Sequence, residues 1–277
     1  MIKIKLYQIC YLNDQMEKVK KPFVPYDNLK NENPKLCEFP IFNEGFKLAQ
    51  KEQLDYWGFL SPKFSEKSGL TEQKFYDWIT PGSTNVYIVN PCPLNECLFP
   101  SVIVQGNNCH PGLTDLIQRV MNRMNIPINV DQILMDSTSF ALCNYFVGDN
   151  IFWPVYLKFV NNFINEVKNN PNDSKLMFDT GAHYGPNGSL PYYTFVIERL
   201  LSIFLNISSG IKYQIYQYSK EELLNKTKLP EEIMDEIRAL SAIKLAAISG
   251  KHFELLEHWI LLRNNFAKRY PNIFNLE

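Results

Sequence analysis

The sequence predicts an α/β protein in which a mixed sheet is flanked by helices. Short alternating or fully apolar runs, such as residues 2–11 and 86–89, have the pattern of strands. Longer segments with apolar residues at helical spacing lie between these runs, and such alternation is typical of a sheet covered by helices. The chain has 277 residues, of which 45% are hydrophobic and 21% charged, so it can bury a sizeable core.

The first part of the chain shows apolar runs separated by proline-rich or polar segments. Residues 13–21 are polar, and Pro22 and Pro25 then mark an irregular loop that reaches Asn28. The elements that we expect here are a strand over 2–11, this loop, a short helix over 41–54, a buried strand from Asp55 that Ser61 and Pro62 end, and a helix capped by Thr71.

The remaining elements are predicted in the same way, from apolar spacing and from the prolines and glycines that interrupt it. They are a strand over 86–89, a helix opened by His110 and Pro111 and ended by Pro127, a strand or turn over 140–146, a helix over 152–164, a helix over 192–205, a strand over 211–218 and two helices after Pro230. Residues 171–191 are rich in Pro, Gly, Asn and Asp, which predicts a long loop and a functional flap.

Charge and composition exclude several classes of protein. The formal net charge of −1 gives no global attraction to nucleic acid, so no nucleic-acid partner is expected. Met1 leads directly into an alternating strand, and the chain contains no apolar run of about 18 residues, the length that spans a membrane. Its six cysteines are scattered and lack zinc-knuckle spacing. We therefore expect a cytoplasmic protein with reduced thiols and no metal-ligating side chains.

Five stretches together carry a family resemblance. They are Cys37-Glu38-Phe39, residues 56–64 (Tyr-Trp-Gly-Phe-Leu-Ser-Pro-Lys-Phe), the strand end at Asn90-Pro91, residues 144–147 followed by Phe152-Trp153, and residues 195–201 (Phe-Val-Ile-Glu-Arg-Leu-Leu). In this order they resemble small GT-A-like glycosyltransferases of bacterial capsule and lipopolysaccharide gene clusters. The resemblance covers roughly residues 2–218, and its most specific parts are 57–64 and 198–201.

The resemblance implies a GT-A-like catalytic domain over residues 1–225 that binds a nucleotide sugar, followed by a C-terminal helical hairpin over 226–277. The implied reaction moves a sugar from a donor, which we expect to be UDP-linked, to a glycan or lipid-linked acceptor at the inner face of the inner membrane. Basic residues of the hairpin, such as Lys244 and Arg263, allow peripheral contact with anionic lipid. The alternative, which we favour, is that the hairpin packs on the domain or on a second subunit of a homodimer.

The metal motif of the family is missing. GT-A enzymes usually hold Mn or Mg with an Asp-x-Asp at the end of a central strand, and this chain contains no Asp-x-Asp. The corresponding strand ends in Asn90-Pro91-Cys92. The sequence therefore leaves open whether a divalent metal, or cationic side chains, backbone amides and a helix N-terminus, would stabilise the leaving diphosphate.

Three carboxylates are candidates for the base that takes the proton of the acceptor hydroxyl. Glu198 lies beside the apolar stripe of its helix, and the alternative role for it is an ion pair with Arg199. Asp136 precedes Ser137-Thr138-Ser139 and can equally cap a turn, and Asp179 lies in the predicted flap. Glu198 is the preferred candidate because it belongs to the family resemblance.

Candidate substrate-binding residues lie at the predicted strand ends. For the donor diphosphate we expect Lys63, and His110 together with the helix N-terminus that follows it. The remaining candidates are Tyr7, Gln8 and Tyr11 beside the base, Asp27 and Asn28 near ribose or sugar hydroxyls, and Asn90 and Arg199 in the family motifs. Ordinary turn or core roles are the alternatives for these residues.

Two rival functions remain open. One is a non-catalytic GT-A-like protein that binds a glycan or a partner, which the missing Asp-x-Asp favours. The other is a transferase of an acyl or phosphorus-containing group. The chain has no Gly-rich phosphate loop and no Gly-x-Ser-x-Gly elbow, which argues against kinases and hydrolases.

Overall fold

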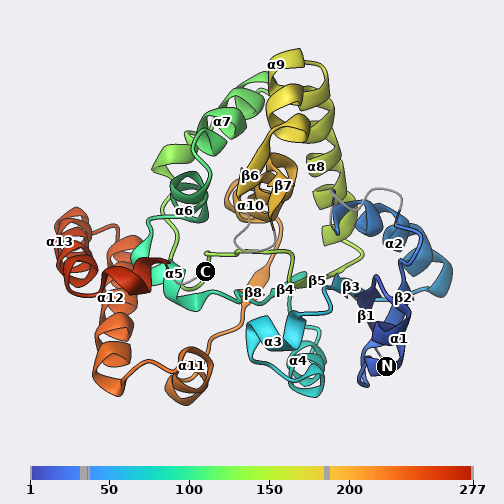
Figure 1. The fold of residues 1–277 in the computed structure, drawn as a ribbon, viewed down its shortest axis with the longest axis horizontal. Coiled ribbons are helices and arrows are strands. Elements are labelled where there is room, and N and C mark those ends of the chain that lie inside the picture. Colours follow the sequence, from blue (N-terminus) through green and yellow to red (C-terminus); the bar gives the residue numbers. More distant parts are fainter. Residues whose placement is uncertain (1, 32–35, 37, 184–187, 276–277) are drawn as a thin grey trace.

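The computed structural model describes residues 2–31, 36, 38–183 and 188–275. A six-stranded mixed sheet lies at its centre, with strand order β2-β1-β3-β5-β4-β8 (Figure 1). Its strands are β1 (Ile4–Cys10), β2 (Val24–Asp27), β3 (Tyr56–Leu60), β4 (Val86–Ile88), β5 (Phe146–Asp149) and β8 (Tyr213–Ile215). Neighbouring strands are parallel except at β5, which runs antiparallel to both β3 and β4. The predicted mixed α/β architecture is confirmed.

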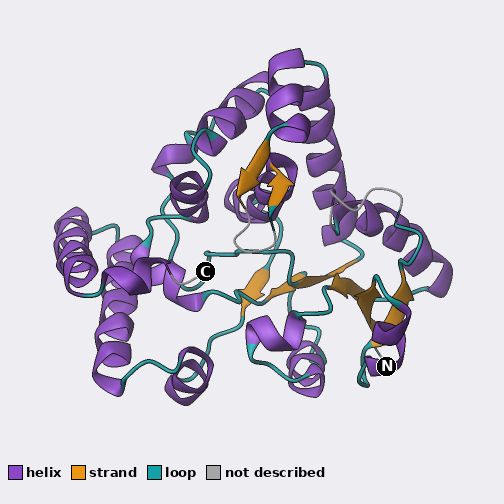
Figure 2. Ribbon diagram, viewed as in Figure 1, coloured by secondary structure: helices purple, strands orange, loops and turns teal. Residues whose placement is uncertain are grey.

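Helices cover both faces of this sheet (Figure 2). On one face lie α2 (Phe39–Glu52), α8 (Phe152–Lys168) and α10 (Tyr192–Ile207), and on the other lie α3 (Phe64–Ser68) and α4 (Glu72–Ile79). The further helices are α1 (Asn13–Lys18), α5 (Pro93–Leu98), α6 (Val102–Cys109), α7 (Leu113–Arg123), α9 (Pro171–Ser174), α11 (Lys220–Thr227), α12 (Glu231–Gly250) and α13 (Phe253–Arg269). None of the helices among the described residues combines the length and apolarity that crossing a membrane requires.

Strand β3 shows how the sequence pattern produces the two-sided core. Its five residues are all buried, because alternate side chains enter the two apolar layers on opposite faces of the sheet. Trp57 points to the α2 and α8 side and stacks on Trp153, with ring centroids 4.0 Å apart. Leu60 packs on the opposite side with Phe64 of α3. The continuous apolar run therefore predicted a central strand correctly.

The prediction of an irregular loop before Asn28 was wrong, because β2 occupies part of it. Strand β2 pairs with β1 along the edge of the sheet, and Tyr7 lies opposite Val24. An edge strand tolerates Pro25, since the side that lacks a partner strand needs no N–H donor. The prolines therefore marked the edge of the sheet and not the absence of a strand.

The predicted flap over 171–191 is also partly structured. It contains α9, a π-helical turn η3 (Lys175–Asp179) and a hairpin of β6 (Gly181–His183) and β7 (Ser189–Pro191). Residues 184–187 of that prediction lie outside the described residues. The local richness in Pro, Gly and Asn reflects tight turns between very short elements.

The two predicted C-terminal helices are α12 and α13, which pack on each other at one side of the molecule (Figure 1). Helix α12 also packs on α5, and side chains from both C-terminal helices join the main apolar core: Met234, Ile237, Leu240, Trp259 and Phe266. Lys244 of α12 is fully buried and donates hydrogen bonds to the carbonyl oxygens of Glu96 and Phe99. The hairpin thus shares the core of the body.

Candidate functional site

The carboxyl ends of the parallel strands and the amino end of β5 meet at one edge of the sheet. This edge carries Tyr11 after β1, Ser61 after β3, Asn90 after β4, and Tyr145 directly before β5. The hydroxyls of Ser61 and Tyr145 lie 2.9 Å apart, and the Val89 amide donates to the Tyr145 carbonyl oxygen at 2.8 Å. In open α/β sheets ligands bind at this kind of edge, which makes it the candidate site.

Helix α10 holds a carboxylate and a guanidinium near this edge. Arg199 is buried, and its Nη1 donates to the Phe195 carbonyl oxygen at 2.9 Å and to Glu198 Oε2 at 3.1 Å. Its Nη2 donates to Gln105 Oε1 of α6 at 2.8 Å. A Cβ atom at Gly106 would lie 2.5 Å from Arg199 Nε, so the glycine is what lets α6 approach the arginine closely. Arg199 therefore fixes the position of Glu198.

A second carboxylate lies close enough to Glu198 for the charge of Glu198 to act on it. Burial raises the pKa of Glu38, the residue before α2, and the negative charge of Glu198 raises that pKa further. A hydrogen bond from the Asn144 side chain opposes these effects. The Oδ1 atom of Asn144 is buried and has no hydrogen-bond partner within the described part of the chain. Glu38 and Glu198 thus lie near each other at the sheet edge, and the Asn144 side chain hydrogen-bonds Glu38.

Lys67 lies close enough to these carboxylates for its charge to act on Glu38, and Lys226 lies next to Lys67. Lys226 of α11 donates to the carbonyl oxygen of Lys67 in α3. Burial lowers the pKa of Lys226, and the nearby charge of Lys67 lowers it further. The positive charge of Lys67 also acts on Glu38 and on the thiol of Cys143. Burial raises the pKa of that thiol, and the charge of Glu198 raises it further. The edge therefore presents two carboxylates with ammonium groups close by.

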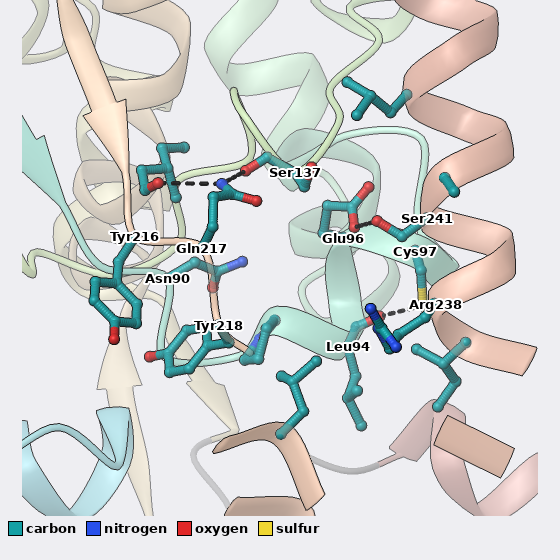
Figure 3. A pocket seen from close by; sticks show the side chains of 16 residues that line it. Asn90, Leu94, Glu96, Cys97, Ser137, Tyr216, Gln217, Tyr218, Arg238 and Ser241 are labelled. Carbon is teal, nitrogen blue, oxygen red and sulfur yellow. Dashed lines mark hydrogen bonds between the residues drawn. The ribbon is translucent and has the colours of Figure 1, made fainter. Parts of the chain in front are cut away.

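A pocket of about 250 Å³ opens on the other side of Asn90 (Figure 3). Its walls are α5, the segment that follows β8, and α12 of the hairpin. Asn90 is buried, and its Oδ1 accepts from the Cys92 backbone amide at 3.0 Å. This residue at the end of β4 therefore belongs to both the sheet edge and the pocket.

His110 lies between two helices, three residues before the helix start at which we expect phosphate, and that phosphate site stays a prediction. His110 is the C-cap of α6, where its backbone amide donates to the Gly106 carbonyl oxygen at 2.8 Å. Helix α7 begins at Leu113 after Gly112. The His110 ring stacks on Phe195, with centroids 3.7 Å apart, next to Arg199 on α10. A helix C-terminus carries partial negative charge, which disfavours phosphate.

The rival bases lie elsewhere. Asp136 is buried and its Oδ1 accepts from the Thr138 amide at 2.9 Å, the Thr138 hydroxyl at 2.7 Å and the Ser139 hydroxyl at 3.1 Å. This is the turn-capping role that was its alternative. Asp179 is exposed where the η3 turn ends. Of the three candidate bases, the structure joins Glu198 to the charged cluster at the sheet edge.

The candidates near the first two strands differ in exposure. Tyr7 is buried and stacks on Phe59 with centroids 4.7 Å apart, so its ring belongs to the core. Gln8 and Tyr11 are half-buried on and just after β1. The Asn28 amide donates to the Cys10 carbonyl oxygen at 2.9 Å, which joins the ends of β1 and β2.

The two remaining candidates are exposed. Asp27 accepts from the Leu29 amide at 3.0 Å at the end of β2, and Lys63 lies at the start of α3. Both are thus at the carboxyl edge, where solvent and ligands reach them.

Sequence reasoning missed Glu38, Asn144, Lys67 and Lys226 as site residues. Glu38 and Asn144 belong to the stretches that carry the resemblance, which is the signal that could have identified them. Nothing local marked the lysines, because α3 and α11 approach each other only in the folded chain. Cys37 of the first motif lies outside the described residues.

Across the described residues, no three His, Cys, Asp or Glu side chains converge to hold a metal ion. The five cysteines that the structure describes form no disulfide with one another. No protein-family model, curated protein or solved structure matches this chain.

Proposed function

We propose that this protein is a glycosyltransferase that moves a sugar from a UDP-linked donor to a surface-polysaccharide acceptor. The acceptor is a growing glycan or a lipid-linked sugar at the cytoplasmic face of the inner membrane. The observation that carries the proposal is the pair of carboxylates, Glu38 and Glu198, at the carboxyl edge of the mixed sheet. The sequence resemblance supports it, since both residues belong to its motifs.

The chemistry needs a base at the acceptor. The acceptor oxygen forms a bond to the anomeric carbon of the donor while the bond from that carbon to the phosphate oxygen breaks, and the diphosphate leaves with the electron pair. The hydroxyl proton passes to a carboxylate. Glu38 suits this role because its raised pKa brings its proton affinity closer to neutral pH. Glu198 is a positioning residue in this scheme, since its charge tunes Glu38 and Arg199 holds it in place.

The leaving diphosphate needs positive charge. Lys67 supplies it beside Glu38, Lys226 lies next to Lys67, and Lys63 at the start of α3 adds a third cation at the same edge. Cations that are already in place stabilise developing negative charge without reorganisation at the moment of reaction. This arrangement favours a diphosphate site that contains lysines, whether or not Mn or Mg also binds.

A thermal-shift and calorimetric screen tests the proposal. Purified protein is titrated with UDP, GDP, CMP and their common sugar conjugates, each with and without Mn²⁺. A ligand that binds the folded state raises the melting temperature by mass action, so UDP and UDP-sugars are expected to shift it by several degrees. A Lys67→Ala, Lys226→Ala variant is expected to lose this shift, whereas exposed Lys158→Ala on α8 serves as the matched control.

Each outcome separates the rival functions. A shift with UDP-sugars, followed by release of UDP when a glycan acceptor is added, supports the transferase. Binding without release of UDP under any acceptor favours the non-catalytic glycan- or partner-binding protein. Absence of any shift with all nucleotides on folded protein overturns the proposal.

A further inference from the structure

The pocket beside Asn90 is built from chain segments that are far apart in the sequence. The end of β4 and helix α5 form one wall, the segment over 215–218 forms the second, and α12 of the hairpin forms the third (Figure 3). Its volume of about 250 Å³ holds a single small ring and not a whole nucleotide sugar.

Amide groups face the open space of this pocket. Asn90 uses its Oδ1 to accept from the Cys92 backbone amide, which leaves its amide nitrogen turned toward the space as a donor. Gln217 uses its Nε2 to donate to the Ser137 carbonyl oxygen at 2.8 Å and the Ile215 carbonyl oxygen at 3.1 Å. Its amide oxygen is thereby turned toward the space as an acceptor (Figure 3). Both orientations are fixed by the protein before any ligand arrives.

Two charged side chains also line the pocket. Glu96 of α5 is buried and its Oε2 accepts from the Ser241 hydroxyl at 2.7 Å. Arg238 lies at the exposed rim of the α12 wall. The pocket therefore offers a neutral donor, a neutral acceptor, a carboxylate, a hydroxyl and a guanidinium around one small volume.

Apolar groups complete the lining. The Tyr218 ring is held in place because its hydroxyl donates to the Ser68 carbonyl oxygen at 2.8 Å. Leu94, Leu223 and Ile237 lie around it. Tyr216 and Tyr218 meet edge to face, with 76° between the ring planes, so they do not form two parallel walls for a flat base.

These features select among ligand classes. The charged residues of the lining are one carboxylate and one guanidinium, Glu96 and Arg238, so the lining offers no net positive charge to a phosphate or a nucleotide. Crossed tyrosine rings disfavour a nucleobase. A sugar ring has hydroxyls that donate and accept at once, and its C–H face packs on aromatic and aliphatic groups. We propose that this pocket, between α5, the segment after β8 and α12, binds one neutral sugar ring of a saccharide.

The hairpin is required for this site. Helix α12 contributes Ile237, Arg238 and Ser241 to the wall, and Lys244 on the same helix anchors it to α5 through the Glu96 and Phe99 carbonyl oxygens. The pocket thus exists only when the hairpin is docked. Under the proposed function the bound ring belongs to the acceptor glycan. This identification as acceptor rests on the proposed function, whereas the binding of a saccharide to the pocket does not rest on it.

Saturation-transfer difference NMR on the full chain, with no nucleotide present, tests the proposal. The probes are the methyl glycosides of glucose, galactose and N-acetylglucosamine, at millimolar concentration. Ala242→Phe fills the pocket from the exposed face of α12, and Ala246→Phe makes the same change one turn further along, outside the pocket. We expect at least one glycoside to bind, Ala242→Phe to weaken it at least tenfold, and Ala246→Phe to leave it unchanged.

The outcomes are decisive for the pocket and separate from the transferase. No binding of any glycoside to folded wild-type protein overturns the assignment, as does binding that Ala242→Phe leaves intact. Since the donor screen uses nucleotides and this test uses none, a failure of one leaves the other result standing.

Discussion

Two buried carboxylates in this molecule have neighbours of opposite charge: a carboxylate lies near Glu38, and an ammonium lies near Glu96. Burial raises the pKa of both Glu38 and Glu96. Glu96 lies 3.7 Å from the Lys244 ammonium and accepts from Ser241, so opposite charge and a hydrogen bond compensate it. The like charge of Glu198 raises the pKa of Glu38 further, against hydrogen bonds from the backbone and Asn144 and the charge of Lys67. A carboxylate whose neighbour is its ion-pair partner is typical of an anchor, whereas two carboxylates close together at a sheet edge are typical of a site for chemistry.

The largest expected effect is on the anchor. Lys244→Met leaves Glu96 buried without its cation, and removing one partner of a buried pair costs about 3–5 kcal/mol. Urea denaturation of the variant measures this loss. In the double variant Glu96→Gln, Lys244→Met we expect most of the lost stability to return, because no buried charge remains. Equal stability of Lys244→Met and wild type would show that the pair is not compensating.

The second effect is on the site. Glu38→Gln removes the proposed base, so sugar transfer should fall at least about 100-fold, the lower range for loss of a general base. A carboxyl whose folded pKa is raised destabilises the fold progressively as the pH rises from the unfolded pKa, near 4.3, to the folded pKa. The variant should therefore melt at a higher temperature than wild type at pH 8 and lose this advantage at pH 4. Glu44→Gln, on the exposed side of α2, is the control for both measurements.

Concerted loss of activity and stability in Glu38→Gln would contradict the comparison. That result would place Glu38 with Glu96, as a carboxylate that the fold needs, and would leave Glu198 as the remaining candidate base.

The third effect is the pH dependence of the anchor. Burial lowers the pKa of Lys244 to about 8, although Glu96, Cys97 and Asp136 all raise it. The unfolded lysine titrates near 10.4, so between about pH 8 and 10 the unfolded chain binds more protons than the folded one. Wild-type stability should therefore rise by about 2 kcal/mol relative to Lys244→Met across this window. Parallel curves for the two proteins would contradict the lowered pKa.

The smallest effect concerns the support of Glu198. Gly106→Ala places a Cβ 2.5 Å from Arg199 Nε, so the guanidinium must move and Glu198 with it. Alanine is favoured over glycine in a helix by about 1 kcal/mol, and this gain offsets the cost of moving the guanidinium. The melting temperature should therefore change little. We expect transfer to fall about tenfold with the KM for the donor unchanged, since positioning of the carboxylate affects the chemical step. An unchanged kcat would remove Arg199 from the positioning role.

The sequence correctly predicted those elements that can be recognised from their own residues alone. The apolar runs of β3 and β4 and the cap at Thr71, whose hydroxyl accepts from the Lys74 amide at 3.2 Å, follow directly from their own residues. Strand β2 was missed because pairing with β1 overrides its prolines. Helices α5 and α6 were missed because they are short, and Pro93 and Gly106 interrupt their pattern.

The site residues likewise fall into those that the sequence identified and those that only the folded structure reveals. Glu198 and Arg199 were found because a compact motif contains both of them. Glu38 and the lysines gain their chemistry from Asn144, Glu198 and the α3–α11 contact, which are distant along the chain. The pocket beside Asn90 was invisible, because three separate segments meet only in the folded state.

The position of α12 in the chain has a consequence for biosynthesis. The ribosome delivers every strand of the sheet before it delivers this helix, so the pocket acquires its last wall after the sheet has been synthesised. Until then Leu94 and Leu223 lack the cover of Ile237, and a nascent chain at this stage presents an apolar surface that chaperones and proteases recognise. Docking of Lys244 onto α5 thus holds in place the helix that closes this pocket.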